Sequence, residues 1–136
     1  MTRIQDQVGR LRRVYARSPR PEEALAWRSY GWHEAPDPAR AIQEHEAFVG
    51  ELERAGAEVV LGATTVDGDP DAIYTYDPLL LSDDGAIVLR PGKGGRRAEP
   101  EAMAADLAHY GIGLLGRLEP PAPPRAGTCC GSTSAC

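Results

Sequence analysis

Residues 69–103 read DPDAIYTYDPLLLSDDGAIVLRPGKGGRRAEPEAM, and this stretch decides the fold. Ser82–Gly85 is rich in turn-forming residues and lies between two apolar segments. We therefore expect two strands, Ile73–Tyr76 and Ala86–Arg90, joined through Leu79–Leu81 and this turn.

The C-terminal continuation of this stretch has the pattern of a helix and a strand. Pro100 suits the first turn of a helix, and Gly111 suits its end. Apolar residues recur between them at helical spacing: Met103, Leu107 and Tyr110. Ile112–Leu118 is apolar enough for a further strand.

The N-terminal side predicts a strand, a helix and another strand. Leu11–Ala16 reads as the first strand, and Glu58–Leu61 as a short buried one. Asp37-Pro38 starts a helix with a capping acid and a proline, and Gly56 ends it. Its apolar residues repeat at helical spacing: Ala41, Ile42, His45, Phe48, Val49, Leu52 and Ala55. The alternation of strands and helices predicts an α/β chain.

Composition narrows the functional classes. A chain of 136 residues forms one compact domain, and a net charge of −5 disfavours nucleic acid and anionic membranes as partners. Met1–Arg13 is polar, and no apolar run approaches the length of a membrane span. We expect a cytoplasmic protein that binds a small molecule and is compatible with homo-oligomerisation.

Asp71, Asp77 and Arg96 are the candidate binding residues. On one strand, the two acids would share a face, but a straight strand would separate them by roughly 20 Å. Either the chain bends near Pro70, or each acid contacts a different part of a ligand. The planar guanidinium of Arg96 pairs well with a carboxylate. From spacing alone, solvated acids and a solvated Arg96-Arg97 pair are the simpler interpretation.

Two other kinds of site find little support. Pro-Gly-Lys-Gly-Gly at 91–95 lacks the full phosphate-loop pattern. Cys129, Cys130 and Cys136 have neither C-x-x-C spacing nor a paired histidine, so they make a poor metal site. We expect no metal and no cofactor.

Taken in order, these pieces resemble dimethylarginine dimethylaminohydrolase and its relatives, the arginine deiminases and amidinotransferases. The family pattern is an acid, an apolar strand ending in Asp, a hairpin, and a strand running into R-P-G-x-x-x-R-R-x-E. Here the pattern reads Asp71, Ile73–Pro78, Gly85–Gly92 and Arg96-Arg97-Ala98-Glu99. The resemblance covers nearly all of residues 11–121. It implies an α/β propeller of the pentein type, built of ββαβ modules, of which this chain would be about the first two.

The resemblance also implies roles. Asp77 would hold the substrate guanidinium, Asp71 would position the substrate, and Arg96 would bind its carboxylate. Pro21–Pro36 would be a lid over the site. Some relatives carry a substrate-contacting Glu just before the motif's Asp, and here that position is Tyr76.

The family's nucleophilic cysteine, catalytic histidine and second acid are not found where the family would place them. His45 lies on the apolar face of its helix, where a packed core histidine is the simpler interpretation. His33 and His109 also lack the expected context. The chain therefore predicts the N-terminal part of a hydrolase that cleaves the guanidino C–N bond of arginine derivatives to citrulline and an amine. Alone, it would be inactive.

The C-terminal tail suggests why the family's catalytic residues are not found. Residues 1–121 would be the propeller part, and 122–136 an irregular Pro/Gly/Cys tail. Back-translation of Arg125–Cys136 with GC-rich codons, shifted in frame, gives Gly-Gly-Asp-Val-Leu-Trp-Leu-Asp-Glu-Arg-Val, preceded by Glu if Pro124 is CCG. Glu-Gly-Gly-Asp before an apolar strand is the family's pattern at this point, and its Glu is the second acid. We therefore hypothesise a frameshift near Pro121.

Three alternatives stay open. The first is a catalytically dead module that only binds an arginine-like ligand. The second is a relative of the amidinotransferases or arginine deiminases. The third is a small metal binder built on the tail cysteines.

Overall fold

The structure is a computed structural model, and it describes residues 8–120. Strands and α-helices follow in the order β1 (Arg13–Ala16), α1 (Pro38–Arg54), β2 (Glu58–Leu61), β3 (Leu79–Ser82), β4 (Gly85–Val88), α2 (Glu99–Ala108) and β5 (Leu114–Arg117). Three 3₁₀ turns lie between them: η1 (Glu23–Ala26), η2 (Pro70–Ile73) and η3 (Gly94–Ala98). The chain is α/β, as predicted.

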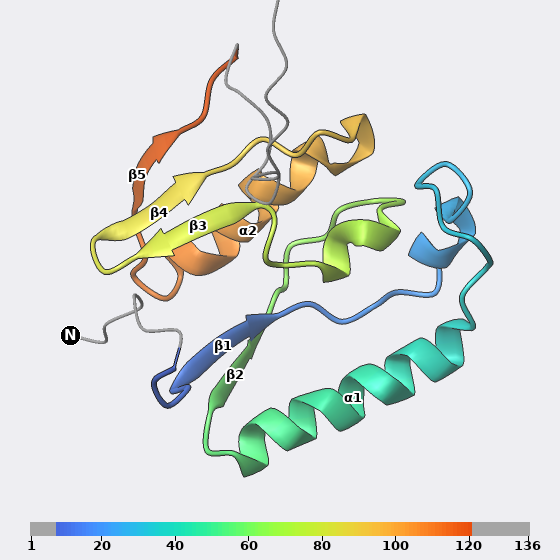
Figure 1. The fold of residues 1–136 in the computed structure, drawn as a ribbon, viewed down its shortest axis with the longest axis horizontal. Helices are drawn as coiled ribbons and strands as arrows, with labels where there is room; N and C mark the ends of the chain where they lie inside the picture. The colour runs from blue at the N-terminus through green and yellow to red at the C-terminus, as the bar shows by residue number, and fades with distance from the viewer. Residues whose placement is uncertain (1–7, 121–136) are drawn as a thin grey trace, which may run out of the picture.

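The first unit is β1-α1-β2. β1 and β2 pair in parallel, with Tyr15 opposite Val60, so α1 serves as the crossover between them. The side chain of Asp37 accepts from the backbone N–H groups of Ala39 and Arg40, which caps the helix as predicted. Gly56, at φ 88°, ends the helix in the left-handed region that glycine adopts without steric cost. Figure 1 shows α1 lying along this strand pair, on the side away from the other sheet.

The second unit is β3-β4-α2-β5, a complete ββαβ arrangement. β3 and β4 form an antiparallel hairpin, and β5 returns parallel to β4 after α2. Gly85 closes the turn at φ 146°, and a Cβ there would meet the carbonyl oxygen of Gly113 at 2.6 Å. One face of the sheet packs on α2 (Figure 1).

The main core lies between this sheet and α2. Its buried members are Leu79, Ala86, Val88, Met103, Ala104 and Leu107, with Tyr15 of β1 packed against them. Asp106 of α2 ties the first unit to this core. It accepts from the hydroxyl of Tyr15 at 2.8 Å, and from the N–H and hydroxyl of Thr64 at 3.0 and 2.7 Å.

The other faces are uncovered in the part of the chain that the structure describes. Large apolar side chains are exposed on α1, on β2, on the second face of β3 and along β5: Phe48, Leu61, Leu80, Leu114, Leu115 and Leu118. No residue of α1 is buried, so its predicted apolar face is only partly covered.

One predicted strand is wrong. Ile73–Tyr76 is not a strand: Pro70–Ile73 forms η2, and Tyr74–Asp77 forms a turn in which the N–H of Asp77 donates to the carbonyl of Tyr74 at 3.3 Å. Asp69 explains the difference, because its side chain caps the N–H of Asp71 just before a proline at the first helical position. The hairpin strand is instead Leu79–Ser82.

None of the helices within residues 8–120 is long and apolar enough to cross a membrane.

Candidate active-site half

Arg96 is the centre of a cluster of acids. From η3, its Nη1 donates to Oδ2 of Asp77 at 2.6 Å. Its Nε and Nη2 donate to the two carboxylate oxygens of Glu99 at 2.5 and 2.8 Å. Nη2 also approaches the carbonyls of Asp71 and Tyr74, at 3.4 Å each. Backbone carbonyls of η2 and of the turn after it, and the carboxylate of Asp77, thus all contact one guanidinium. The planar shape of a guanidinium, with several N–H donors, suits several acceptors.

The charges in this cluster perturb each other. Burial lowers the pKa of Arg96, but hydrogen bonds and attraction from Glu99 and Asp77 outweigh it and leave that pKa raised. Burial raises the pKa of Glu99 to about 7, with Asp69 adding to the rise and Arg96 opposing it. Glu99 therefore changes charge near neutral pH while it holds Arg96 in place.

Asp71 is buried and holds two donors from different segments. Nε1 of Trp32 donates to its Oδ1 at 2.7 Å, and Nζ of Lys93 donates to its Oδ2 at 2.6 Å. Nε of Arg96 lies 4.0 Å from the same Oδ2. The buried carboxylate is thus paired with charge on one side and with an indole on the other.

Asp77 faces outward. Its side chain is 41% exposed, whereas those of Asp71 and Glu99 are 4% and 3% exposed. Two exposed tyrosines precede it in the same turn, Tyr74 at 50% and Tyr76 at 81% exposed. Asp77 is therefore the most exposed carboxylate of the cluster.

The predicted lid, Pro21–Pro36, lies against this cluster through Tyr30 and Trp32. The carbonyl of Tyr30 accepts from Lys93 at 2.7 Å, and the indole of Trp32 bonds to Asp71. Burial, together with nearby Asp69, raises the pKa of Tyr30 to about 12.

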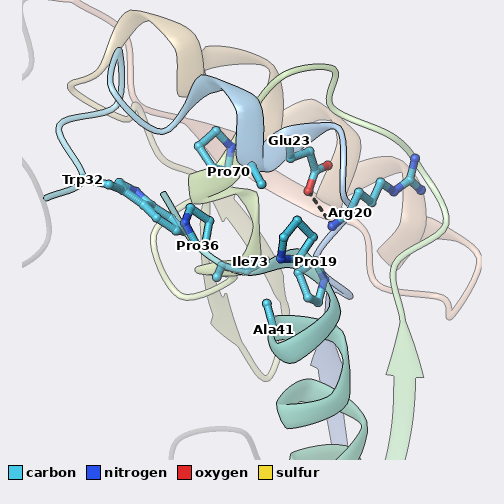
Figure 2. A pocket seen from close by; sticks show the side chains of 10 residues that line it. Pro19, Arg20, Glu23, Trp32, Pro36, Ala41, Pro70 and Ile73 are labelled. Carbon is cyan, nitrogen blue, oxygen red and sulfur yellow. Dashed lines mark hydrogen bonds between the residues drawn. The ribbon is translucent and has the colours of Figure 1, made fainter. Parts of the chain in front are cut away.

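A small apolar hollow lies next to Trp32. Figure 2 shows the rings of Trp32, Pro19, Pro36 and Pro70 around Ile73. Its volume is about 50 Å³, far below the several hundred Å³ of a typical ligand pocket. This hollow is therefore too small for an arginine-sized molecule.

The structure brings all three candidate residues, Asp71, Asp77 and Arg96, into one cluster. The two acids do so because the chain bends at η2, which was one of the two predicted explanations. The sequence did not identify Lys93, Trp32 or Glu99 as parts of the cluster. The i, i+3 spacing of Arg96 and Glu99 at the start of a helix was the available signal for Glu99.

The histidines and cysteines lie elsewhere. His33 and His109 are exposed, and Nδ1 of His109 is 2.8 Å from the carbonyl of Ala105. His45 is half-buried, and burial lowers its pKa. The three cysteines lie outside the described residues. Among residues 8–120, no group of histidine, cysteine and carboxylate side chains could hold a metal ion.

Comparison with known proteins finds relatives that are dimethylarginine dimethylaminohydrolases. The chain is 30% identical over 92 residues to N(G),N(G)-dimethylarginine dimethylaminohydrolase of Pseudomonas aeruginosa, covering 68% of this chain and 36% of that protein. It is 27% identical over 109 residues to the enzyme of the same name from Streptomyces coelicolor, covering 80% and 42%. No protein-family model matches the sequence.

The fold agrees. A crystal structure of a dimethylarginine dimethylaminohydrolase variant as an adduct with S-methyl-L-thiocitrulline superposes with a TM-score of 0.66 at 26% identity. The match covers 86% of this chain and 45% of the other. The chain thus spans less than half the length of the relatives it matches. Sequence and fold together place it in the superfamily of the dimethylarginine dimethylaminohydrolases and amidinotransferases.

Proposed function

We propose that this chain is the substrate-binding part of a dimethylargininase-like hydrolase, which cleaves the guanidino C–N bond of an arginine derivative to citrulline and an amine. The observation that carries the proposal is the convergence of Asp71, Asp77 and Arg96 on one hydrogen-bonded cluster with Asp77 facing outward. Recognition of an amino acid with a cationic side chain needs a carboxylate for the cation and a guanidinium for the anion, and this cluster contains both.

Binding would proceed by exchange of partners. Arg96 and Asp77 are bound to each other at 2.6 Å. A ligand carboxylate would replace Asp77 on Arg96, and the ligand guanidinium would take the freed carboxylate. Glu99 keeps the guanidinium of Arg96 oriented through this exchange, because it holds Nε and Nη2 rather than Nη1.

Hydrolysis needs a nucleophile that this cluster does not contain. A thiolate attacking the guanidinium carbon requires a base within hydrogen-bond reach. Residues 8–120 contain no cysteine. We propose that the residues for chemistry belong to the part of the family fold beyond Pro121, and that a frameshift there replaces them with the tail at 122–136. That tail lies outside the described residues, so the coding sequence is the test. Codons that cannot encode the shifted run would overturn the frameshift.

The decisive experiment compares this chain with a version whose reading frame is restored to full length. Citrulline released from dimethylarginine is measured for both proteins. Turnover only by the restored protein supports the proposal. In the restored protein, Asp77→Asn should abolish most turnover, whereas the exposed turn residue variant Asp84→Asn should not. Equal turnover by Asp77→Asn would remove Asp77 from the site.

The product distinguishes the superfamily's reactions. Dimethylamine with citrulline indicates a dimethylargininase, ammonia with citrulline indicates an arginine deiminase, and transfer of the amidino group to an added amine indicates an amidinotransferase.

A second candidate function is a binding module without catalysis. It is favoured by the fact that all three ligand-binding candidates lie within residues 8–120, where there is no cysteine. Isothermal titration of dimethylarginine into the 136-residue chain tests it. Saturable binding that is lost in Asp77→Asn, without citrulline, would support this function.

A further inference from the structure

Lys93 connects three segments that are distant in the sequence. Its Nζ donates to the carbonyl oxygen of Tyr30 at 2.7 Å and to Oδ2 of Asp71 at 2.6 Å. The same Nζ lies 5.7 Å from the centre of the Tyr30 ring, within the range of a cation–π contact. Lys93 is the only lysine in the chain.

Two further contacts hold the same two sides together. Trp32 donates to the other oxygen of Asp71, so Asp71 is contacted from both the predicted lid and the loop that carries Lys93. On that loop, Gly95 lies directly under Tyr30, because an added Cβ would sit 2.2 Å from the Tyr30 hydroxyl oxygen. The loop that carries Lys93 and the Pro21–Pro36 segment therefore pack closely against each other, in addition to their charged contact.

The two partners of Lys93 differ in what they lose without it. Without Lys93, buried Asp71 keeps Arg96 as a charge partner at 4.0 Å. Residues 27–37 contain no strand and no α-helix, and the backbone-to-backbone hydrogen bonds of residues 27–36 lie within local turns between residues 24 and 32. Losing the Lys93 contact would thus affect the segment more than it affects the rest of the fold.

We propose that Lys93 is a positioning residue that latches the Pro21–Pro36 segment over the candidate site, by bridging the Tyr30 carbonyl to Asp71. With the latch closed, Asp71 has a donor on each carboxylate oxygen. With the latch released, the segment moves away from Asp71 and the site opens. The idea that the site binds a guanidino ligand rests on the proposed function, but the latch itself does not.

Hydrogen exchange of the folded chain tests the latch directly. In Lys93→Met, backbone amides of residues 27–37 should exchange about tenfold faster, as expected when a charge-assisted hydrogen bond is lost from a local opening equilibrium. Lys93→Arg should restore slow exchange, because a guanidinium can bridge the same two acceptors. Arg97→Met is the matched control, since it removes a positive charge from an exposed side chain of the same loop.

Chemical modification gives a second route that does not depend on how the variant folds. The Lys93 side chain is 51% exposed, so acetylation of the folded protein can reach it. Acetylation removes the charge and should accelerate exchange at residues 27–37 as Lys93→Met does. Lys93→Arg treated in the same way is the control, because its α-amino group is the only amine left to acetylate and every other reactive side chain is unchanged. Unchanged exchange after both substitution and acetylation would overturn the latch.

Added dimethylarginine separates this proposal from the proposed function. If the latch is confirmed and dimethylarginine changes no exchange rate near Asp71 or Asp77, the ligand assignment fails while the latch stands. If dimethylarginine binds but Lys93→Met leaves residues 27–37 as protected as in the native chain, the latch fails and the ligand assignment stands.

Discussion

The guanidinium of Arg96 donates to the carboxylate of Asp77 at 2.6 Å, across 19 positions of sequence. The family resemblance gives these two residues opposite ends of one ligand, yet here they are bound to each other. Each residue is thereby held in place by the other, and a ligand must compete with this pair. Affinity for a guanidino ligand would then depend on how strongly Arg96 holds Asp77 as well as on the contacts that the ligand gains.

Arg96 should be the most important single side chain for stability in the cluster. Arg96→Ala leaves buried Glu99 without its charge partner and frees the turn at Asp77. Removing one partner of a buried ion pair costs about 3–5 kcal/mol of unfolding free energy. Urea denaturation should show a loss of that size. Exposed Arg97→Ala should stay within about 0.5 kcal/mol. A loss no larger than that control would mean that the cluster does not hold the fold.

Stability should fall as pH rises from 4.5 toward about 7, and Glu99 should be a cause. Burial raises the pKa of Glu99 to about 7 from its ordinary 4.5. The folded state therefore binds a proton more tightly than the unfolded state, so this contribution is present below pH 4.5 and is lost as pH approaches 7. Burial also raises the pKa of Glu23, in the same direction. Burial lowers the pKa of His45, which opposes them.

A difference measurement isolates Glu99. The unfolding free energies of the native chain and of Glu99→Gln are compared between pH 4.5 and 7.5. The native chain should lose stability relative to the variant as pH rises, whatever the variant's overall stability. Parallel pH profiles would show that Glu99 titrates at its ordinary pKa.

Asp106 should join the two units energetically. Burial acts to raise the pKa of Asp106, but hydrogen bonds from Thr64 and Tyr15 outweigh it and lower that pKa. The stabilisation is therefore present above its unfolded pKa and is lost as pH falls through the folded pKa. Asp106→Asn and Tyr15→Phe, made singly and together, form a double-mutant cycle. A coupling energy of about 1–2 kcal/mol is expected at pH 7, since the bond is charge-assisted. Additive effects would contradict the link.

The uncovered apolar residues predict self-association. Leu80 lies on the face of β3 opposite α2, and Leu115 is exposed on the edge strand β5. Exposed strand edges and apolar patches favour pairing with another copy. Sedimentation velocity should show concentration-dependent association, and Leu80→Lys should reduce it. Arg90→Lys, a charge-conserving change at an exposed position, serves as control. A monomer at all concentrations would show that these exposed apolar residues do not drive self-association.

The sequence correctly predicted the elements whose ends are set by neighbouring residues, such as α1. It failed at Ile73–Tyr76, where a hydrogen bond to one side chain determines the backbone conformation. The Asp37-Pro38 cap and Gly56 correctly bounded α1, because both ends are set by residues next to the helix in the sequence. Ile73–Tyr76 has β-forming residues, but the Asp69 cap followed by Pro70 turns the chain into a 3₁₀ helix. These β-forming residues therefore misled the strand assignment there.

Three members of the cluster were predicted from the sequence, but its other members and its pairings were not. Asp71, Asp77 and Arg96 were found from the motif, and the bend at Pro70 was one of the expected explanations for how both acids meet. That Arg96 binds Asp77, and that Lys93 and Trp32 bind Asp71, depends on tertiary contacts between segments up to 39 residues apart. No local pattern encodes such contacts.

Tyr76 should set the preference among guanidino ligands. It lies beside Asp77 and is 81% exposed, at the position where some relatives carry Glu. A tyrosine ring contacts methyl groups and a flat cation favourably but adds no second carboxylate. Dimethylarginine should therefore bind more tightly than arginine, whose unsubstituted guanidinium needs more acceptors than Asp77 alone provides.

Tyr76→Glu should reverse this preference. The new carboxylate offers a second charge-assisted bond, which is worth about 1.5–3 kcal/mol, or roughly tenfold to a hundredfold in the dissociation constant for arginine. Dimethylarginine should gain less, since methylation removes donors. Tyr76→Phe keeps the ring and should leave the ratio of the two affinities unchanged. Calorimetric titration of both ligands measures that ratio, in the chain and in the frame-restored protein. An equal ratio in Tyr76→Glu and the native protein would mean that position 76 does not face the guanidinium, and that Asp77 selects the ligand without it.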